Sequence, residues 1–439
     1  MNASSYIDDE SKSLSEVHSS VPVPAGASFL RKLLAFSGPG YLVAVGYMDP
    51  GNWATDLAGG AKFGYSLLFV ILLSNIVAII LQHLALKLGV ATGKDLAQVC
   101  RDNYSKPVRI GLWLMAEIMI IACDLAEVIG SAIALNLLFH IPLAIGVVIT
   151  AADVLLILML QKKGFRYLEA LIIALIATIV VAFGLELILS RPEIAPLLAG
   201  FIPSVAIFSD KEMLYIALGI IGATVMPHNL FLHSSVVQTR QFVRDLAGKK
   251  EAVKFATIDT VIALMGAFFV NSAILIMSAS VFHFSGYSDV ADIDKAYELL
   301  TPLLGTSLAS IVFALALLAS GQNSTLTGTL TGQIIMEGFL HLKMRPWLRR
   351  ISTRLLAIIP ALAVILFFSD FGVGRLLILS QVVLSIQLPF AVVPLVMFTS
   401  DKQKMGDFVN RRWLKITSYL LAIGIVALNV WLIYNLAVG

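Results

Sequence analysis

The chain carries little charge for its length. Charged residues make up 13% of its 439 residues, whereas hydrophobic residues make up 58%. A soluble domain has about 25% charged residues, so this composition excludes an ordinary soluble protein. Long apolar stretches recur along nearly the whole sequence. They predict an all-α membrane protein that crosses the bilayer many times.

Other absences exclude further classes of function. The two cysteines, Cys100 and Cys123, are too few for a disulfide framework or a cysteine-based metal site. There is no phosphate-binding glycine loop, hydrolytic triad or His-Glu-x-x-His cluster, so nothing predicts an enzyme or a resident cofactor. Nothing indicates nucleic acid or an obligate protein as a partner either. Residues 1–28 lack the basic start and apolar core of a signal peptide, and we expect a disordered cytoplasmic tail.

Eleven apolar stretches are long enough to be membrane spans. They cover approximately residues 38–60, 65–90, 108–139, 143–161, 167–189, 213–237, 255–283, 302–340, 351–368, 374–398 and 414–437. If the N-terminus is cytoplasmic, 26 of the 31 Lys and Arg residues fall on the cytoplasmic side. The other side holds only Lys62, Arg191, Lys211, Lys295 and Arg375. This asymmetry obeys the positive-inside rule and predicts an external C-terminus.

Two of the spans contain helix-breaking sequences. Asp49-Pro50-Gly51-Asn52 interrupts the first span, and Met226-Pro227-His228-Asn229 interrupts the sixth. A carboxylate at mid-membrane costs at least about 2.5–3.5 kcal/mol, and proline removes a backbone donor. Helices five spans apart cross the membrane in opposite directions. We therefore predict an inverted repeat of five spans (29–190) and five spans (191–400), with 401–439 supplying an additional helix.

The residues at the two breaks favour a transition-metal cation. Asp49 offers a negatively charged carboxylate and Asn52 an amide oxygen, and unwound backbone near Gly46 and Ala223 offers carbonyls. The thioether of Met226 is a soft ligand that suits Mn²⁺, Fe²⁺, Co²⁺, Zn²⁺ or Cd²⁺ and offers nothing to Mg²⁺ or Ca²⁺. The alternative for this methionine is simple packing. In the tenth span, Gln387 is a further candidate contact.

The third span carries three carboxylates on one helical face. Glu117, Asp124 and Glu127 fall within roughly 80° of one another, a pattern that predicts a proton or ion route. Arg354, at the start of the ninth span, is a possible partner, and for Glu117 a structural ion pair is an equal alternative.

Two histidines of the sixth span extend this route. Histidine side chains ordinarily titrate near neutral pH, so His228 and His233 are candidate proton carriers, with structural hydrogen bonding as the alternative. Asp153 and Glu186 are weaker candidates.

Four motifs of the chain resemble the Nramp family of divalent metal transporters. They are Asp49-Pro50-Gly51-Asn52, Asp124-Leu125-Ala126-Glu127, Met226-Pro227-His228-Asn229 and Gly321-Gln322-Asn323-Ser324-Thr325-Leu326-Thr327-Gly328. One departure is Asn323 in the fourth motif, where the family usually has Ser, and we expect it to have little effect. The resemblance implies the inverted-repeat fold of the sodium-coupled leucine transporter. It also implies proton-coupled uptake of Mn²⁺ and Fe²⁺ by alternating access.

The resemblance also implies roles for particular residues. The family's metal contacts fall on Asp49, Asn52, Ala223 (carbonyl), Met226 and Gln387. Its proton-route positions fall on Asp49, Asp124, Glu127, His228, His233 and Arg354. Two alternatives stay open, a sodium-coupled amino-acid carrier on the same scaffold and a passive metal channel. Asp49 disfavours the first because it would repel a substrate carboxylate. The short tail and compact loops suggest a bacterial inner-membrane protein.

Overall fold

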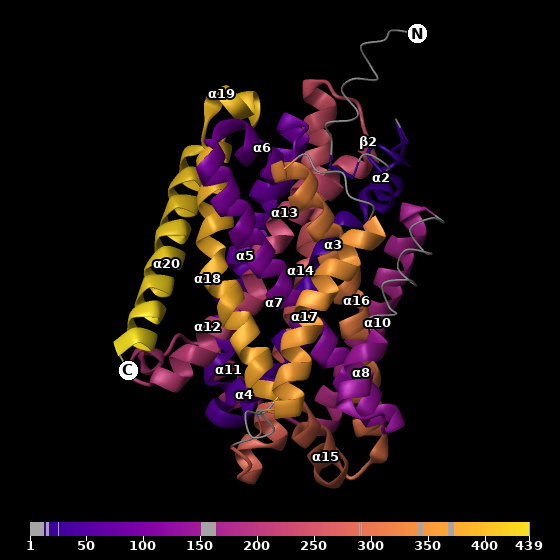
Figure 1. The fold of residues 1–439 in the computed structure, drawn as a ribbon, viewed down its shortest axis with the longest axis vertical. Coiled ribbons are helices and arrows are strands. Elements are labelled where there is room, and N and C mark those ends of the chain that lie inside the picture. Colours follow the sequence, from indigo (N-terminus) through magenta and orange to yellow (C-terminus); the bar gives the residue numbers. More distant parts are fainter. Residues whose placement is uncertain are drawn as a thin grey trace.

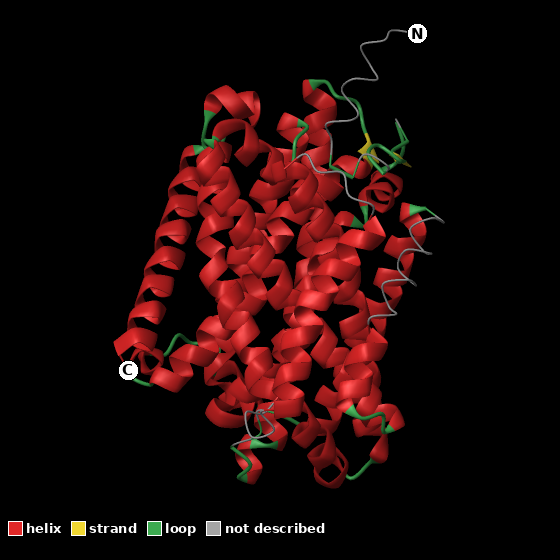
Figure 2. Cartoon of the chain, in the orientation of Figure 1, coloured by secondary structure: helices red, strands yellow, loops and turns green. Residues whose placement is uncertain are grey.

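The computed structural model describes the whole chain except residues 1–12, 15–16, 25, 151–163, 289, 291, 341–345, 368–372 and 439. Nearly all of the described chain is helical (Figure 2). The helices are α2 (Phe29–Phe36), α3 (Pro39–Gly46), α4 (Pro50–Phe63), α5 (Leu68–Thr92), α6 (Leu96–Asn103), α7 (Lys106–Phe139), α8 (Leu143–Thr150), α10 (Phe165–Ser190), α11 (Ile194–Ala199), α12 (Lys211–Val225), α13 (Pro227–Val236), α14 (Leu246–Val281), α15 (Ile293–Leu304), α16 (Ser307–Leu340), α17 (Pro346–Phe367), α18 (Val373–Thr399), α19 (Lys402–Met405) and α20 (Arg412–Val438). Two short strands, β1 (Val21–Pro22) and β2 (Arg240–Gln241), pair in parallel.

The helices confirm the prediction of an all-helical membrane protein. Within the described ranges, eight helical segments are long and apolar enough to cross a membrane. Each predicted span other than the fourth coincides with one helix or with a broken pair of helices. The fourth begins as α8, and its remainder, which includes Asp153, lies outside the described residues.

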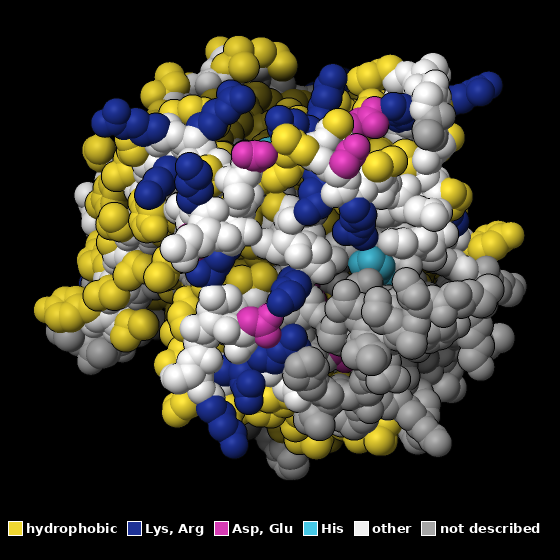
Figure 3. Space-filling model, turned by 90° about the horizontal axis from the view of Figure 1, so that it is seen from above, with side chains coloured by type: hydrophobic (Ala, Val, Ile, Leu, Met, Phe, Trp, Pro, Cys, Tyr) yellow, Lys and Arg dark blue, Asp and Glu magenta, His cyan; other side chains and the backbone are white. Residues whose placement is uncertain are grey.

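The long helices lie side by side along the longest axis of the molecule (Figure 1). Helix α2 lies at one end of this bundle, and α20 stands at its margin, where it packs against α18 and ends at the opposite end. Lys and Arg side chains are spread over the bundle end that carries α2, α6 and α19, as Figure 3 shows. This distribution agrees with the basic-rich side expected from the sequence.

The two broken helices lie in the interior of the bundle. The first pair, α3 and α4, packs mainly against α14, and α4 also contacts α12 and α18. The second pair, α12 and α13, packs against α18 and α5. Outside them, α7 packs along α16 and α17. Because surrounding helices cover both breaks, their unwound backbone is shielded from lipid.

Side-chain caps fix where several helices begin. Asp95, Asp210 and Asp245 each precede a helix, and each carboxylate accepts hydrogen bonds from backbone N–H groups of its first turn. At Asp95 the cap is reciprocal, since the Gln98 side chain accepts from the Asp95 N–H at 2.9 Å. Burial raises the pKa of Asp95 to about 6, in spite of these hydrogen bonds.

The N-terminal segment is not disordered where the structure describes it. The Leu14 N–H donates to the Glu337 carboxylate at 3.0 Å, and β1 pairs with β2. The side chains of Leu14 and Val21 are buried. In the described part of this segment, apolar side chains and backbone groups therefore find partners on the bundle.

Candidate functional site

The first break lies between α3 and α4. Asp49 adopts an extended conformation (φ −72°, ψ 164°), and its Oδ1 accepts a hydrogen bond from the Asn52 N–H at 2.8 Å. The carboxylate thus caps α4, whose first residue is Pro50. Because proline has no N–H, the carbonyl of Gly46 loses the donor that a continuous helix would supply four residues later.

The second break repeats this arrangement with different chemistry. Met226 lies between α12 and α13 with φ 35° and ψ 98°, a backbone conformation that is strained for a residue with a side chain. Its side chain makes no capping hydrogen bond to α13. Pro227 follows directly, so the carbonyl of Ala223 lacks its helical donor for the same reason as Gly46.

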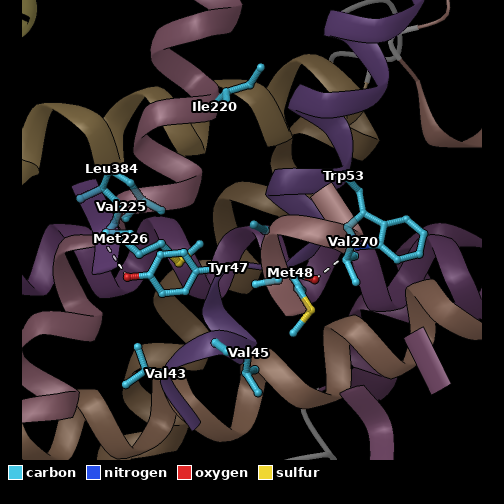
Figure 4. Close-up of a cluster of buried hydrophobic side chains, with 14 of the residues drawn as sticks. Val43, Val45, Tyr47, Met48, Trp53, Ile220, Val225, Met226, Val270 and Leu384 are labelled. Carbon is cyan, nitrogen blue, oxygen red and sulfur yellow. Dashed lines mark hydrogen bonds between the residues drawn. The ribbon is translucent and has the colours of Figure 1, made fainter. Parts of the chain in front are cut away.

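The two breaks meet inside the protein. A methyl group placed on Gly46 would lie 3.1 Å from the Met226 sulfur and 2.3 Å from the Asn229 Nδ2, so only glycine allows this approach. The Asn229 amide donates to the Val43 carbonyl at 3.2 Å. Figure 4 shows Tyr47 and Met226 side by side, with the Tyr47 hydroxyl donating to the carbonyl of Val225 at 3.5 Å.

Other carbonyls of the first break have side-chain donors. Asn271 donates to the Tyr47 carbonyl at 2.9 Å, and both Trp53 and Ser320 donate to the Met48 carbonyl. These bonds hold the unwound segment in one conformation. The carbonyl of Gly46 differs from these two, because Pro50 stands where its helical donor would be.

Several side-chain oxygens around the breaks are buried and lack a hydrogen-bond donor. Among the described residues these include Asp49 Oδ2, Asn52 Oδ1, Asn229 Oδ1 and Gln381 Oε1. Buried oxygens without donors are costly unless a cation or water satisfies them. No cluster of three His, Cys, Asp or Glu side chains suited to a metal occurs in the described ranges. The donor set is therefore mixed, with one carboxylate, neutral oxygens and the Met226 thioether.

The glutamine of α18 that lies beside the first break is Gln381 and not the predicted Gln387. Its amide nitrogen would lie 1.6 Å from a methyl group on Gly51, two residues after Asp49, and it donates to Ser380 Oγ at 3.1 Å. The predicted contact, Gln387, lies six residues farther along the same helix, and its Oε1 is buried without a partner. No hydrogen bond among the described residues joins Gln387 to either break.

The carboxylates of α7 face a buried arginine. Arg354 Nη1 lies 3.2 Å from Glu127 Oε2 and 4.0 Å from Asp124 Oδ1, and its Nη2 donates to Thr325 Oγ1 at 3.0 Å. All three charged side chains are at most 8% exposed. The structure thus brings together three residues that the sequence placed on one route. Glu117 lies on the same helix but is only half-buried.

A thiol links this charged cluster to the second break. Cys123 Sγ donates to Glu127 Oε1 at 3.5 Å and lies 3.8 Å from His228 Nε2. Among the described residues, the other ring nitrogen of His228 has no hydrogen-bond partner. The chain of contacts therefore runs from His228, beside Met226, through Cys123 and Glu127 to Arg354.

His233 lies in a different network. Its Nδ1 is 3.0 Å from Gln82 Oε1 and its Nε2 is 3.4 Å from Thr260 Oγ1. Gln82 in turn donates to the Tyr47 hydroxyl at 2.8 Å. Both ring nitrogens are engaged, and the network connects His233 to the first break through Tyr47.

Sequence reasoning missed some residues of this region. Gln381 and Cys123 carry no signal of their own, because their roles depend on which helix faces which. Asp56 carried a readable signal, since it lies seven residues, or two helical turns, beyond Asp49 on the same face of α4. It is buried, with an Oδ2 that lacks a partner. Glu186, a weaker candidate, is buried with both carboxylate oxygens unpartnered.

Comparison with known proteins places this arrangement in a family. Residues 40–435 match the family model described as natural resistance-associated macrophage protein-like, or Nramp. The chain belongs to the Nramp family. This is a family of transporters rather than enzymes, as the sequence predicted.

Curated Nramp relatives extend over nearly the whole chain. A protein of Nostoc sp. (strain PCC 7120) named divalent metal cation transporter MntH is 62% identical over 421 residues, which are 96% of this chain and 95% of that protein. A protein of the same name from Listeria monocytogenes is 60% identical over 422 residues, covering 96% and 94% of the two chains.

Solved structures agree with the Nramp assignment. The crystal structure of the Eremococcus coleocola manganese transporter, with an aromatic bis-isothiourea substituted compound, superposes with a TM-score of 0.88 at 45% identity. The match covers 95% of this chain and 90% of that one. Mhp1, a nucleobase-cation-symport-1 family transporter in a closed conformation, gives a TM-score of 0.59 at 14% identity over 91% and 92% of the chains. At this identity the likeness shows the fold alone.

Proposed function

We propose that this Nramp chain is a proton-coupled secondary transporter that imports divalent transition-metal ions by alternating access. Its substrates are Mn²⁺ and Fe²⁺, and also Cd²⁺ and Co²⁺, whereas Ca²⁺ and Mg²⁺ are excluded. One observation carries the proposal. The Met226 sulfur of the second break approaches Gly46 of the first, and the first break also holds two buried side-chain oxygens without donors, Asp49 Oδ2 and Asn52 Oδ1.

The donor set suits a metal that accepts both hard and soft ligands. Asp49 and Asn52 supply oxygens from the first break, and the carbonyl of Ala223 and the sulfur of Met226 supply ligands from the second. Gln381 takes the role that we expected of Gln387. Mg²⁺ and Ca²⁺ bind oxygen ligands and gain nothing from a thioether, so the sulfur gives the site its selectivity.

The architecture we propose has eleven spans. Spans one to five (29–190) and six to ten (191–400) form inverted repeats, with α3–α4 and α12–α13 as the discontinuous first and sixth helices. Span eleven (401–439) stands outside the repeat. The N-terminus is cytoplasmic, the C-terminus is external, and the bacterial cell membrane is the location. Breaks at matching positions of two inverted halves suit a substrate site that opens alternately to each side.

Protons move along a set of side chains that overlaps the metal site at Asp49. The route includes Asp49, which both ions share, and then His228, Glu127, Asp124 and Arg354. The contacts from His228 through Cys123 to Glu127 support this order. His233 belongs to the same route through its network with Tyr47. Arg354 lies 3.2 Å from Glu127 and forms the cytoplasmic end of the proposed route.

Uptake into proteoliposomes tests the proposed function. Vesicles containing the full chain should accumulate Mn²⁺ under an inward proton gradient, and the lumen should acidify as the metal enters. Glu127→Gln should reduce acidification several-fold more than Mn²⁺ uptake, whereas Glu117→Gln on the same helix should change neither. Free movement of Ca²⁺ or Mg²⁺ without Mn²⁺ uptake would contradict the proposed selectivity. Mn²⁺ flux with no proton movement would indicate a passive channel instead.

A further inference from the structure

A basic pocket lies at the end of the bundle where α5, α14 and the connection from α19 to α20 meet. It has a volume of about 370 Å³. Its lining includes His83, Lys87, Lys250, Asp407, Arg411 and Trp413. Three of these are Lys or Arg, and the only acidic residue among the lining side chains is Asp407. The volume falls within the range of roughly 300–1,000 Å³ that is typical of small-ligand sites.

Lys87 is the unusual member of this basic pocket. Its side chain is only 6% exposed, and its ammonium group donates to the Asn410 amide oxygen, a neutral partner. No ion pair of the described residues includes Lys87, Lys250 or Arg411. A buried ammonium group without a negative partner is costly, whereas an anion in the pocket would compensate it.

The surroundings of the basic pocket indicate which anion it suits. The pocket opens where α20 begins, at Trp413, whose side chain is 62% exposed. Ile416 and Leu420 follow on α20 at helical spacing and are also largely exposed. An exposed tryptophan above an apolar face is typical of the membrane–water interface. The pocket therefore combines positive charge at headgroup level with an apolar surface for acyl chains directly below it.

We propose that the basic pocket binds the phosphate headgroup of an anionic phospholipid, whose acyl chains lie along the exposed face of α20. Lys87, Lys250 and Arg411 contact the phosphate, and Trp413 marks the level of the glycerol backbone. Basic pockets between spanning helices at the cytoplasmic surface are suited to such headgroups. The proposal rests on the proposed orientation, in which this end of the bundle is cytoplasmic, but it does not depend on which metal is transported.

Lipid titration of the purified full chain in detergent tests this site. Native mass spectrometry would count bound lipid, and thermal unfolding would report its effect, with phosphatidylglycerol, phosphatidylcholine and soluble glycerol phosphate as the probes. We expect phosphatidylglycerol to bind and raise the unfolding temperature at concentrations where the other two do neither. Equal binding of phosphatidylcholine would overturn the proposal. Equal stabilisation by glycerol phosphate would assign the pocket to a soluble anion and would also overturn it.

Variants of the pocket residues locate the binding. Lys87→Gln should raise the half-saturating concentration of phosphatidylglycerol by roughly tenfold, and Lys250→Gln or Arg411→Gln by about fivefold each. The control is Lys254→Gln, an exposed residue one turn along α14 that does not line the pocket; it should change the value less than about twofold. If Lys87→Gln does not fold, the other two variants still decide. An equal effect of all four substitutions would indicate general surface attraction and would refute a defined site.

Discussion

The two helix breaks have the same backbone plan but supply different chemistry. At the first, Asp49 caps the following helix with its side chain and keeps one carboxylate oxygen unpaired. At the second, Met226 has no charge and no capping bond, and its backbone is held at φ 35°. The first break therefore contributes the attraction for any cation. The second contributes the discrimination among cations.

The difference also concerns what keeps each break open. The Asp49 carboxylate stabilises the start of α4 whether or not Pro50 follows it. No side chain does this at Met226, so Pro227 alone prevents α12 from continuing into α13. A strained residue costs of order 1–3 kcal/mol, and it persists only where the surrounding packing fixes it. The comparison thus predicts which substitutions each break tolerates.

The largest effect should follow removal of the charge. Asp49→Ala should lower the apparent affinity for Mn²⁺ by roughly 30-fold to 1,000-fold, because it removes the one ionised ligand of a buried site. Metal-dependent uptake into proteoliposomes measures this change. Asp49→Asn is the matched control for packing and should be almost as inactive. Mn²⁺ transport close to that of the unmodified protein in either variant would remove Asp49 from the site.

The next effect concerns selectivity rather than affinity. Met226→Ala should reduce Mn²⁺ affinity by no more than about tenfold, while Ca²⁺ becomes a substrate. Met226→Leu fills nearly the same volume without sulfur and separates ligand chemistry from packing. Competition of Ca²⁺ with Mn²⁺ uptake is the measurement. If Met226→Leu still excludes Ca²⁺, the methionine acts through packing and the proposed division between the two breaks fails.

The prolines should differ in effect although their backbone roles look alike. Pro227→Ala should lower Mn²⁺ affinity by about tenfold, because the restored N–H can pair with the carbonyl of Ala223 and close the break. Pro50→Ala should lower it by about twofold, since the Asp49 cap maintains the first break. Binding isotherms of both variants test the ranking. A larger loss in Pro50→Ala would reverse the comparison.

The smallest effect should distinguish two glutamines of α18. Gln381→Ala should weaken Mn²⁺ binding by roughly threefold to tenfold, the range expected for one hydrogen bond or neutral ligand. Gln387→Ala on the same helix should change it by less than about twofold. Isothermal titration with Mn²⁺ resolves both values. A greater loss from Gln387→Ala would support the contact expected from the sequence instead.

Most of the helices could be predicted from the sequence, because a bilayer requires long apolar runs and most Lys and Arg residues lie on its cytoplasmic side. The sequence also predicted both breaks, since Pro50 follows a carboxylate within an apolar span and Pro227 occupies the matching place five spans later. It did not predict Gln381 or Cys123, since such contacts depend on how helices rotate against one another, whereas the helical spacing of Asp56 from Asp49 could have been read from the sequence. The contacts of the N-terminal segment depend on the folded bundle in the same way. Its Ser-rich composition resembles disorder, but Val21 and Leu14 find partners that only the folded bundle provides.

The most direct test is the position of a bound Mn²⁺ ion in crystals of the full chain. Anomalous difference maps recorded near the manganese absorption edge should show one strong peak between the two breaks. The peak should lie within coordinating distance of both the Asp49 carboxylate and the Met226 sulfur, and it should vanish in Asp49→Ala. A peak bound only by Asp49 and solvent, with Met226 turned away, would contradict the account of a shared site.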